Sequence, residues 1–139
     1  LHDAGRLLLF KDMPYASVQA MIHAHSNMLP LPEAEREIFG FTHAAVGQRL
    51  LAEWNFPPAI VAAVGHHHDD TLAAGSAEGA VVQLADILAN AVEISAGGVY
   101  VVPGCPPGAE GRAGLPMWDI PRILAAHDAA IDELVRALL

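Results

Sequence analysis

Apolar residues recur along this chain at helical spacing, three or four positions apart, and proline, glycine and polar residues interrupt them at intervals. This pattern predicts helices nearly throughout. The expected helices cover residues 1–10, 14–28, 32–40, 42–54, 57–68, 78–96 and, as one or two amphipathic helices, 121–139. A polar connection is expected at 69–77 and a Gly- and Pro-rich loop at 97–119, with a short extended piece at 99–102. The predicted fold class is all-α, an orthogonal helical bundle forming a single domain over residues 1–139.

Residues at the expected helix ends support this division. Pro14 suits the first turn of a helix, where the missing amide proton costs nothing. Thr42 is the expected N-cap of the fourth helix. Glu33 and Glu35 lie near the start of the third helix, where a negative charge interacts favourably with the helix dipole.

The fourth helix carries an apolar stripe of Val46, Leu50 and Trp54. His43 lies on the same stripe, so it is expected to face inward or to line a cleft. Gly47, one turn further on, leaves room beside it. These positions allow two interpretations of His43, a metal ligand or a core histidine with a hydrogen-bond partner.

The composition indicates one globular domain, because 53% of the 139 residues are hydrophobic. Aromatic residues make up only 6%, so the core is expected to consist of Ala, Leu, Val and Ile. Seven Lys and Arg against 16 Asp and Glu give a net charge of −9. This balance argues against binding to nucleic acid, which needs clustered positive charge, and against docking on an anionic membrane.

The location and extent of the protein follow from a few further features. Cys105 is the single cysteine and cannot form a disulfide within the chain. No apolar run reaches the roughly 18 residues of a membrane span, and no secretory leader is recognised, so a cytoplasmic location is expected. The chain begins at Leu1 without Met, and its first residues resemble the middle of a longer segment, so an N-terminal part is expected to be missing. A face exposed by its absence would favour a homo-oligomer.

The chain contains eight histidines, and His is the commonest side-chain metal ligand. His2 and Asp3 are either ligands, with Asp3 able to bridge two metals, or a solvated helix start. Residues 66–70, three histidines and two aspartates, are either a metal site or charges placed favourably at a helix C-terminus. Asp86 belongs to a polar stripe that faces either water or a polar site, formed with Gln83, Asn90 and Glu93. His23 and His25 are expected at the surface, and His127 has no evident partner.

The order and spacing of these residues resemble the HD superfamily of metal-dependent phosphohydrolases, and in particular its HDOD branch. Residues 1–7 resemble the L-H-D-I-G-K-L stretch of the superfamily. The segments similar to the HDOD branch are 37–47, 54–57 followed by the His67–His68 pair, 84–86 and 118–120. The resemblance extends from residue 1 to about residue 135.

This resemblance implies a helical fold in which His2, Asp3, His43, His67, His68 and Asp86 converge as metal ligands. In the related HD-GYP phosphodiesterases, matching positions hold a metal cluster that activates water for attack on phosphorus. The implied cofactor is a divalent metal, Fe, Mn, Ni or Zn, bound as one or two ions. The alternative is that the site holds no metal. Asp3 and Arg6 are the implied catalytic residues. Arg6 replaces the usual lysine and keeps a positive charge for phosphate.

The G-Y-P signature that follows the histidine pair in HD-GYP enzymes is missing from residues 69–75. The expected function is therefore that of a bacterial signal-transduction module of HDOD type, with signalling proteins or a nucleotide-type small ligand as partners. The alternative is a metal-dependent phosphohydrolase or phosphodiesterase. A third interpretation is a helical structural domain whose histidines lie scattered in space.

Overall fold

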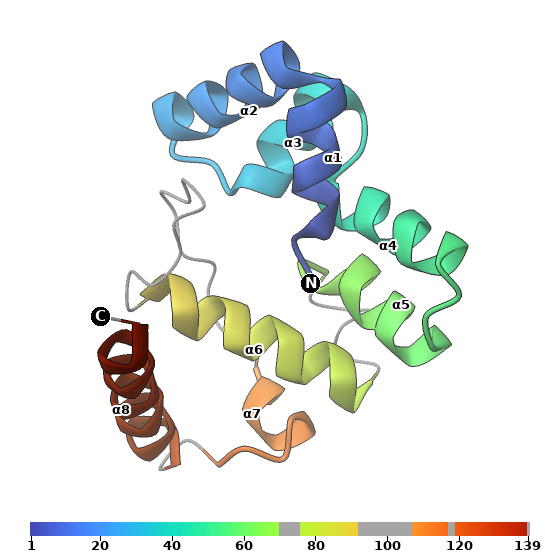
Figure 1. The fold of residues 1–139 in the computed structure, drawn as a ribbon. Coiled ribbons are helices and arrows are strands. Elements are labelled where there is room, and N and C mark those ends of the chain that lie inside the picture. Colours follow the sequence, from blue (N-terminus) through green and yellow to red (C-terminus); the bar gives the residue numbers. More distant parts are fainter. Residues whose placement is uncertain (70–75, 92–106, 117–118, 139) are drawn as a thin grey trace.

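The computed structural model describes residues 1–69, 76–91, 107–116 and 119–138 (Figure 1). These residues form eight helices and no strand, which confirms the all-α prediction. The helices are α1 (Ala4–Asp12), α2 (Pro14–Asn27), α3 (Leu31–Phe39), α4 (His43–Glu53), α5 (Pro58–His66), α6 (Ala77–Ala91), α7 (Ala109–Arg112) and α8 (Ile120–Leu138).

The predicted helix boundaries agree with the structure where local chemistry defines them. Pro14 occupies the first turn of α2. Gly40 ends α3 in the left-handed conformation with φ of 82°, which a glycine adopts without steric cost. Thr42 caps α4, and its hydroxyl oxygen accepts a hydrogen bond from the Ala45 amide at 3.3 Å.

Three predictions about the second half of the chain need correction or lie outside the described residues. The expected loop over 97–119 contains the short helix α7, which a Gly-rich segment did not suggest. The end of the helix predicted over 78–96 and the extended piece at 99–102 fall within 92–106, outside the described residues. The segment expected as one or two helices from 121 onward is the single helix α8.

The buried face of α4 differs from the predicted stripe. Trp54 is 59% exposed, whereas Leu51 is fully buried. The inward residues are His43, Ala44, Gly47 and Leu51. Gly47 favours this orientation, because a Cβ at its position would lie only 3.1 Å from the Val64 side chain of α5 and 3.4 Å from the Gly5 amide nitrogen of α1.

Small aliphatic residues dominate the described core, as the composition predicts. Ala24, Leu31 and Ala34 form a buried cluster between α2 and α3, with Met21 packed against it. Other buried alanines lie on α4, α5, α6 and α7. Alanine side chains keep helix axes close together, so backbone and polar groups of neighbouring helices come within contact distance.

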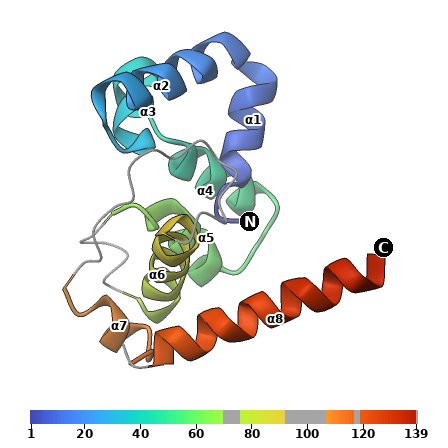
Figure 2. The same cartoon turned by 90° about the vertical axis from the view of Figure 1, so that its left-hand side faces the viewer.

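The helices pack in sequence order around the start of the chain. α1 packs on α4, α4 on α5, and α5 on α6, while α2 and α3 pair on the other side of α1. The first residues of the chain lie beside α5 and α6 (Figure 1). α8 runs along one side and extends past the other helices, as the rotated view shows (Figure 2). The starts of α1 and α4, the end of α5 and the middle of α6 therefore surround one position.

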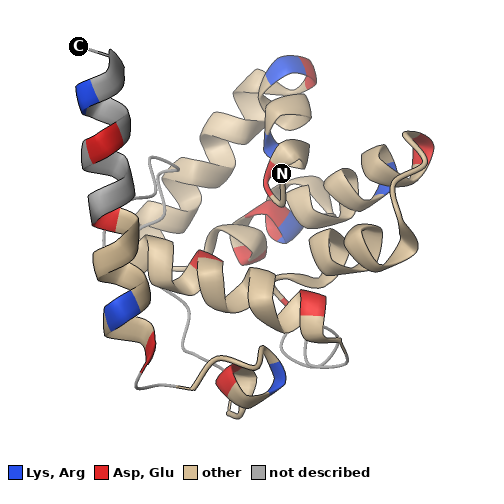
Figure 3. Ribbon diagram, turned by 60° about the horizontal axis from the view of Figure 1, so that its bottom comes forward, with Lys and Arg blue, Asp and Glu red and all other residues tan. Residues whose placement is uncertain are grey.

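Charged residues do not gather on one face of the described chain. Lys and Arg occur on α1, α3, α4, α7 and α8, interspersed with acidic residues (Figure 3). Among the helices described, none has the length and apolar character needed to cross a membrane. Absence of nucleic-acid binding and a cytoplasmic location stay predictions.

Candidate metal centre

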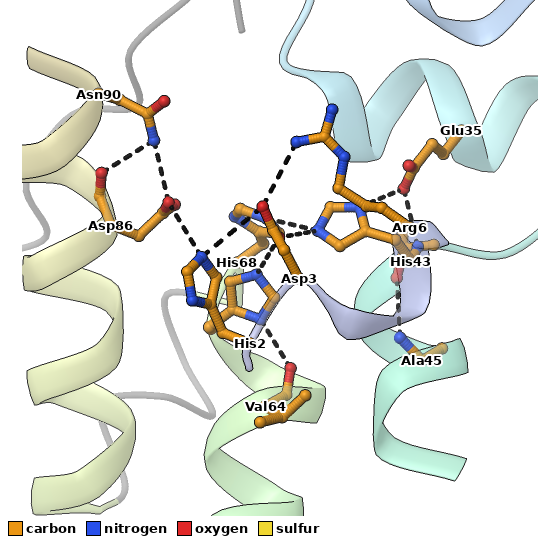
Figure 4. Close-up of polar contacts among 12 residues, drawn as sticks. His2, Asp3, Arg6, Glu35, His43, Ala45, Val64, His68, Asp86 and Asn90 are labelled. Atoms are coloured by element: carbon orange, nitrogen blue, oxygen red, sulfur yellow. Dashed lines mark hydrogen bonds and ion pairs between the residues drawn. The ribbon is translucent and has the colours of Figure 1, made fainter. Parts of the chain in front are cut away.

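Four side chains meet where the ends of three helices converge. Asp3 precedes α1, His43 is the first residue of α4, and His67 and His68 follow α5. The side chains of Asp3, His43 and His68 point toward one another (Figure 4). One potential ligand atom from each of these residues lies within 4.8 Å of the other three. We call these four residues the His–Asp cluster. Its compactness contradicts the interpretation of a structural domain with scattered histidines.

Asp3 occupies the N-cap position of α1 but forms no capping hydrogen bond with its side chain. An aspartate at this position ordinarily accepts a bond from an amide of the first turn. Here its Oδ1 lies 3.2 Å from His43 Nε2 and 3.7 Å from His67 Nε2. Its Oδ2 lies 3.3 Å from Arg6 Nη1. The Asp3 carboxylate therefore contacts the side chains of the His–Asp cluster and Arg6, and it does not cap the first turn of α1.

The ring of His43 is held from its outer side by Glu35 of α3. His43 Nδ1 donates to Glu35 Oε2 at 2.7 Å, and the His43 backbone amide donates to the same oxygen at 2.8 Å. His43 is 2% exposed and Glu35 is 3% exposed. Because a carboxylate oxygen only accepts, Nδ1 carries a proton and Nε2 is directed at Asp3.

His67 has the same arrangement with a different acceptor. Its Nδ1 donates to the backbone carbonyl of Val64 at 2.6 Å, one turn earlier in α5. Its Nε2 is buried and has no hydrogen-bond partner among the described residues. A buried acceptor without a partner costs roughly 1–3 kcal/mol, so such atoms are rare in folded proteins. The lone pair of this nitrogen points toward Asp3.

The protonation of the His–Asp cluster is uneven. Burial lowers the pKa of His43, but hydrogen bonds to Asp3 and Glu35 outweigh it and raise the pKa to about 9. Burial and the charges of His67 and His43 lower the pKa of His68 to about 3. Burial raises the pKa of Asp3, but the hydrogen bond from His43 and the close approach of His67 hold it well below its usual range. At neutral pH, the metal-free cluster therefore contains a charged His43, a neutral His68 and an ionised Asp3.

The distances in the His–Asp cluster suit a single divalent ion. His68 Nε2 lies 3.1 Å from His43 Nε2, close to the His43–Asp3 distance. Ligands bound at 2.0–2.1 Å around a tetrahedral zinc ion are roughly 3.4 Å apart. Three imidazole nitrogens and a carboxylate oxygen form a donor set that suits Zn, Fe, Ni or Mn. The proton on His43 Nε2 lies among the same groups that would surround such an ion.

His2 and Asp86 form a neighbouring pair beside the His–Asp cluster. His2 Nε2 lies 3.4 Å from Asp86 Oδ1 and 3.7 Å from Asp3 Oδ2. Asn90, one turn after Asp86 on α6, donates to Asp86 Oδ1 at 2.9 Å (Figure 4). Burial raises the pKa of Asp86, but the hydrogen bond from His2 outweighs it and holds the pKa below its usual value.

The structure brings together all six residues proposed as ligands, four in the His–Asp cluster and two in the adjoining pair. Their roles as ligands stay predictions. Arg6 is 8% exposed and contacts the Asp3 carboxylate. The polar stripe on α6 faces this site, because Gln83 is buried and Asp86 contacts His2. Glu93 and Asp70 lie outside the described residues.

The other histidines lie elsewhere. His23 Nε2 contacts Glu37 Oε2 at 2.5 Å in an exposed pair that links α2 to α3, which agrees with the predicted surface position of His23. His25 is exposed, as predicted. His127 Nδ1 lies 3.6 Å from its neighbour Asp128.

Sequence reasoning missed two residues that orient the site, Glu35 and Asn90. At Glu35 the sequence predicts only a favourable charge near a helix start. A usable signal existed, because Glu35 is one turn from Leu31 and next to Ala34, on the apolar face of α3. A carboxylate on a buried face requires a partner. Asn90 was recognised only as part of the polar stripe.

Comparison with known families identifies the chain. The family model described as HDOD domain matches residues 1–70. The chain belongs to the HDOD domain family. No curated protein and no solved structure matches it.

The HDOD match covers the whole His–Asp cluster, together with His2, Arg6 and Glu35. It ends before Asp86, so the predicted likeness over residues 84–86 and 118–120 is not part of it. Trp118 also lies outside the described residues. The HDOD assignment therefore rests on the half of the chain that supplies the four clustered side chains.

Proposed function

We propose that this HDOD domain is a signal-transduction module that binds one divalent metal ion in the His–Asp cluster. The supporting observation is His67 Nε2, which is buried, has no hydrogen-bond partner among the described residues and faces Asp3 Oδ1. A metal ion is the partner that this nitrogen lacks. Asp3, His43, His67 and His68 would hold the ion, which would attract a phosphate group of a small nucleotide-type ligand or of a signalling protein.

The regulatory role is favoured over hydrolysis by the position of Arg6. The Arg6 side chain is 10% exposed and its Nη1 contacts Asp3 Oδ2, so it supports the carboxylate from within and is not presented to a substrate. The same contact occupies the side of Asp3 that a second ion would use. The absence of the G-Y-P signature after His68 agrees with this interpretation.

Elemental analysis of the untagged protein tests this proposal. We expect about one equivalent of Fe, Mn, Ni or Zn per chain, either as isolated or after anaerobic reconstitution. His67→Ala should lose the metal, because it removes a ligand and leaves a gap in a buried site. His25→Ala is the matched control, since His25 is exposed on α2. Absence of metal under all these conditions would refute the proposal.

A metal-dependent phosphohydrolase is the second candidate, favoured by the pair His2 and Asp86. Together with Asp3 Oδ2, these side chains offer a second set of ligands next to the first. Two ions bridged by a carboxylate are typical of enzymes that hydrolyse phosphodiesters. This candidate requires two equivalents of metal and turnover of a cyclic dinucleotide, both reduced in Asp86→Asn. One equivalent without turnover would leave the regulatory module as the function.

A further inference from the structure

We propose that Glu35 is a positioning residue for the metal centre, acting through His43. This inference rests on the metal-binding function proposed above. Glu35 comes from α3, which contributes none of the four clustered side chains. It contacts His43 Nδ1, the ring nitrogen that faces away from Asp3. Its effect on metal binding would therefore come from fixing the ligand and not from contact with the ion.

The geometry points to Glu35 because one oxygen atom holds both the backbone and the ring of the same residue. Oε2 accepts from the His43 amide at 2.8 Å and from His43 Nδ1 at 2.7 Å. The amide belongs to the first turn of α4, which has no acceptor within its own helix. Glu35 thus fixes where α4 begins and how its first side chain is turned.

Burial makes this contact specific. Glu35 and His43 are both nearly inaccessible to water, at 3% and 2% exposed. Burying a carboxylate costs free energy unless its hydrogen bonds are satisfied, so the two bonds from His43 are what stabilises Glu35 at this position. With Nδ1 bound to Glu35, only Nε2 remains to face Asp3 and His68. A carboxylate behind a histidine ligand also increases the basicity of the nitrogen that binds the metal.

His67 shows what Glu35 adds. Its Nδ1 is held by a neutral carbonyl from its own helix, Val64. His43 is held by a charged group from a different helix, so its orientation depends on how α3 packs against the start of α4. Both histidines carry a proton on Nδ1, which donates to a side-chain carboxylate in His43 and to a backbone carbonyl in His67. Only the Glu35 contact can be removed by a side-chain substitution.

The test compares Glu35→Ala and Glu35→Gln with Glu33→Ala. Glu33 lies on the exposed side of the same helix. Zinc affinity is measured by competition with a chelator, and the His43 Nδ1 proton is observed by NMR of ¹⁵N-labelled protein. We expect Glu35→Ala to weaken zinc binding roughly 10- to 100-fold. Glu35→Gln keeps an acceptor but not the charge, so its loss should be smaller, and Glu33→Ala should bind as the wild type does.

The NMR signal separates positioning from general stability. In the wild type, the Nδ1 proton should be shifted downfield and protected from exchange, with or without zinc. In Glu35→Ala it should exchange too fast to observe, and in Glu35→Gln it should move upfield. Folded Glu35 variants that keep both the wild-type proton signal and the wild-type zinc affinity would overturn the inference.

The outcome for Glu35 is distinct from the outcome for metal binding itself. If the wild-type protein binds no zinc, the proposed function fails, and the Nδ1 signal in the variants still decides whether Glu35 orients His43. If neither Glu35 variant folds, the wild-type spectrum decides. A His43 ring without a proton on Nδ1 would then refute the inference, and a protected downfield proton would support it.

Discussion

Gly5 of α1 lies directly against the backbone carbonyl of His43, the first residue of α4. A Cβ atom added at Gly5 would overlap that oxygen and lie 2.6 Å from the Gly47 amide nitrogen. No side chain fits between the two helices at this point. This close approach is what brings Asp3, two residues earlier, within reach of the His43 ring.

Gly5→Ala is therefore expected to destabilise the protein and disturb the His–Asp cluster. The neighbouring atoms are backbone and cannot rotate away, so we expect a loss of about 3 kcal/mol in the free energy of unfolding. Urea denaturation measures the loss. Gly111→Ala in α7 is the control, because a Cβ there meets nothing within 4 Å, and we expect it to be neutral or slightly stabilising. Equal stability of the two variants would contradict the close approach of α1 and α4.

Metal binding should release a proton at neutral pH. The pKa of His43 is raised to about 9, so its Nε2 is protonated in the metal-free protein and must lose that proton to bind an ion. His68, with its pKa lowered to about 3, and Asp3 are already deprotonated. The displacement of the His43 proton should make the affinity rise about tenfold per pH unit below pH 9. Calorimetry in buffers of different ionisation enthalpy measures this proton, and a release of none would contradict the prediction.

The stability of the metal-free protein should fall as the pH rises, whereas its affinity for metal should rise. The pKa of His43 in the folded protein, about 9, is above the ordinary histidine value of 6.5. Its contribution to stability is therefore fully present below pH 6.5 and is lost as the pH rises through about 9. Thermal unfolding of the chelator-treated protein over this range measures the loss. His43→Ala should remove this part of the profile, and an unchanged profile in that variant would assign it to another group.

Thr42→Ala should weaken the start of α4. The substitution removes the hydroxyl that accepts from the Ala45 amide at 3.3 Å. We expect a loss of about 1 kcal/mol in the free energy of unfolding. Thr42→Ser keeps the hydroxyl and serves as the control in the same denaturation experiment. A loss in Thr42→Ser as large as in Thr42→Ala would mean that the methyl group, and not the cap, is responsible.

The helices could be predicted because their ends depend on nearby residues. Pro14, Gly40 and Thr42 act through the backbone within one turn, so the sequence alone locates them. The buried face of α4 could not be predicted in the same way. Trp54 is apolar but lies at the exposed end of the helix, and Gly47 defines the packed side because neighbouring helices approach it.

The candidate site likewise has residues that the sequence reveals and residues that only the packing of the helices reveals. Residue type marks His2, Asp3, His43 and the His67–His68 pair as candidates, and the resemblance to the HD superfamily implies that they converge. The sequence does not reveal the role of Glu35, because this role depends on how α3 packs against the start of α4. Such a contact is a property of packing, and in the sequence it leaves only a carboxylate on an apolar face.

Each side chain of the His–Asp cluster lies at a helix end: Asp3 before α1, His43 at the start of α4, and His67 and His68 after α5. Helix ends fray first, and local opening there governs the exchange of amide hydrogens with solvent. An ion bound to these four residues would act as a cross-link that closes three fraying ends at once. Amide exchange in α1, α4 and α5 would then slow together on metal loading. α8 supplies none of the four ligands and would keep its own exchange rate, so the domain would behave as two units of different cooperativity.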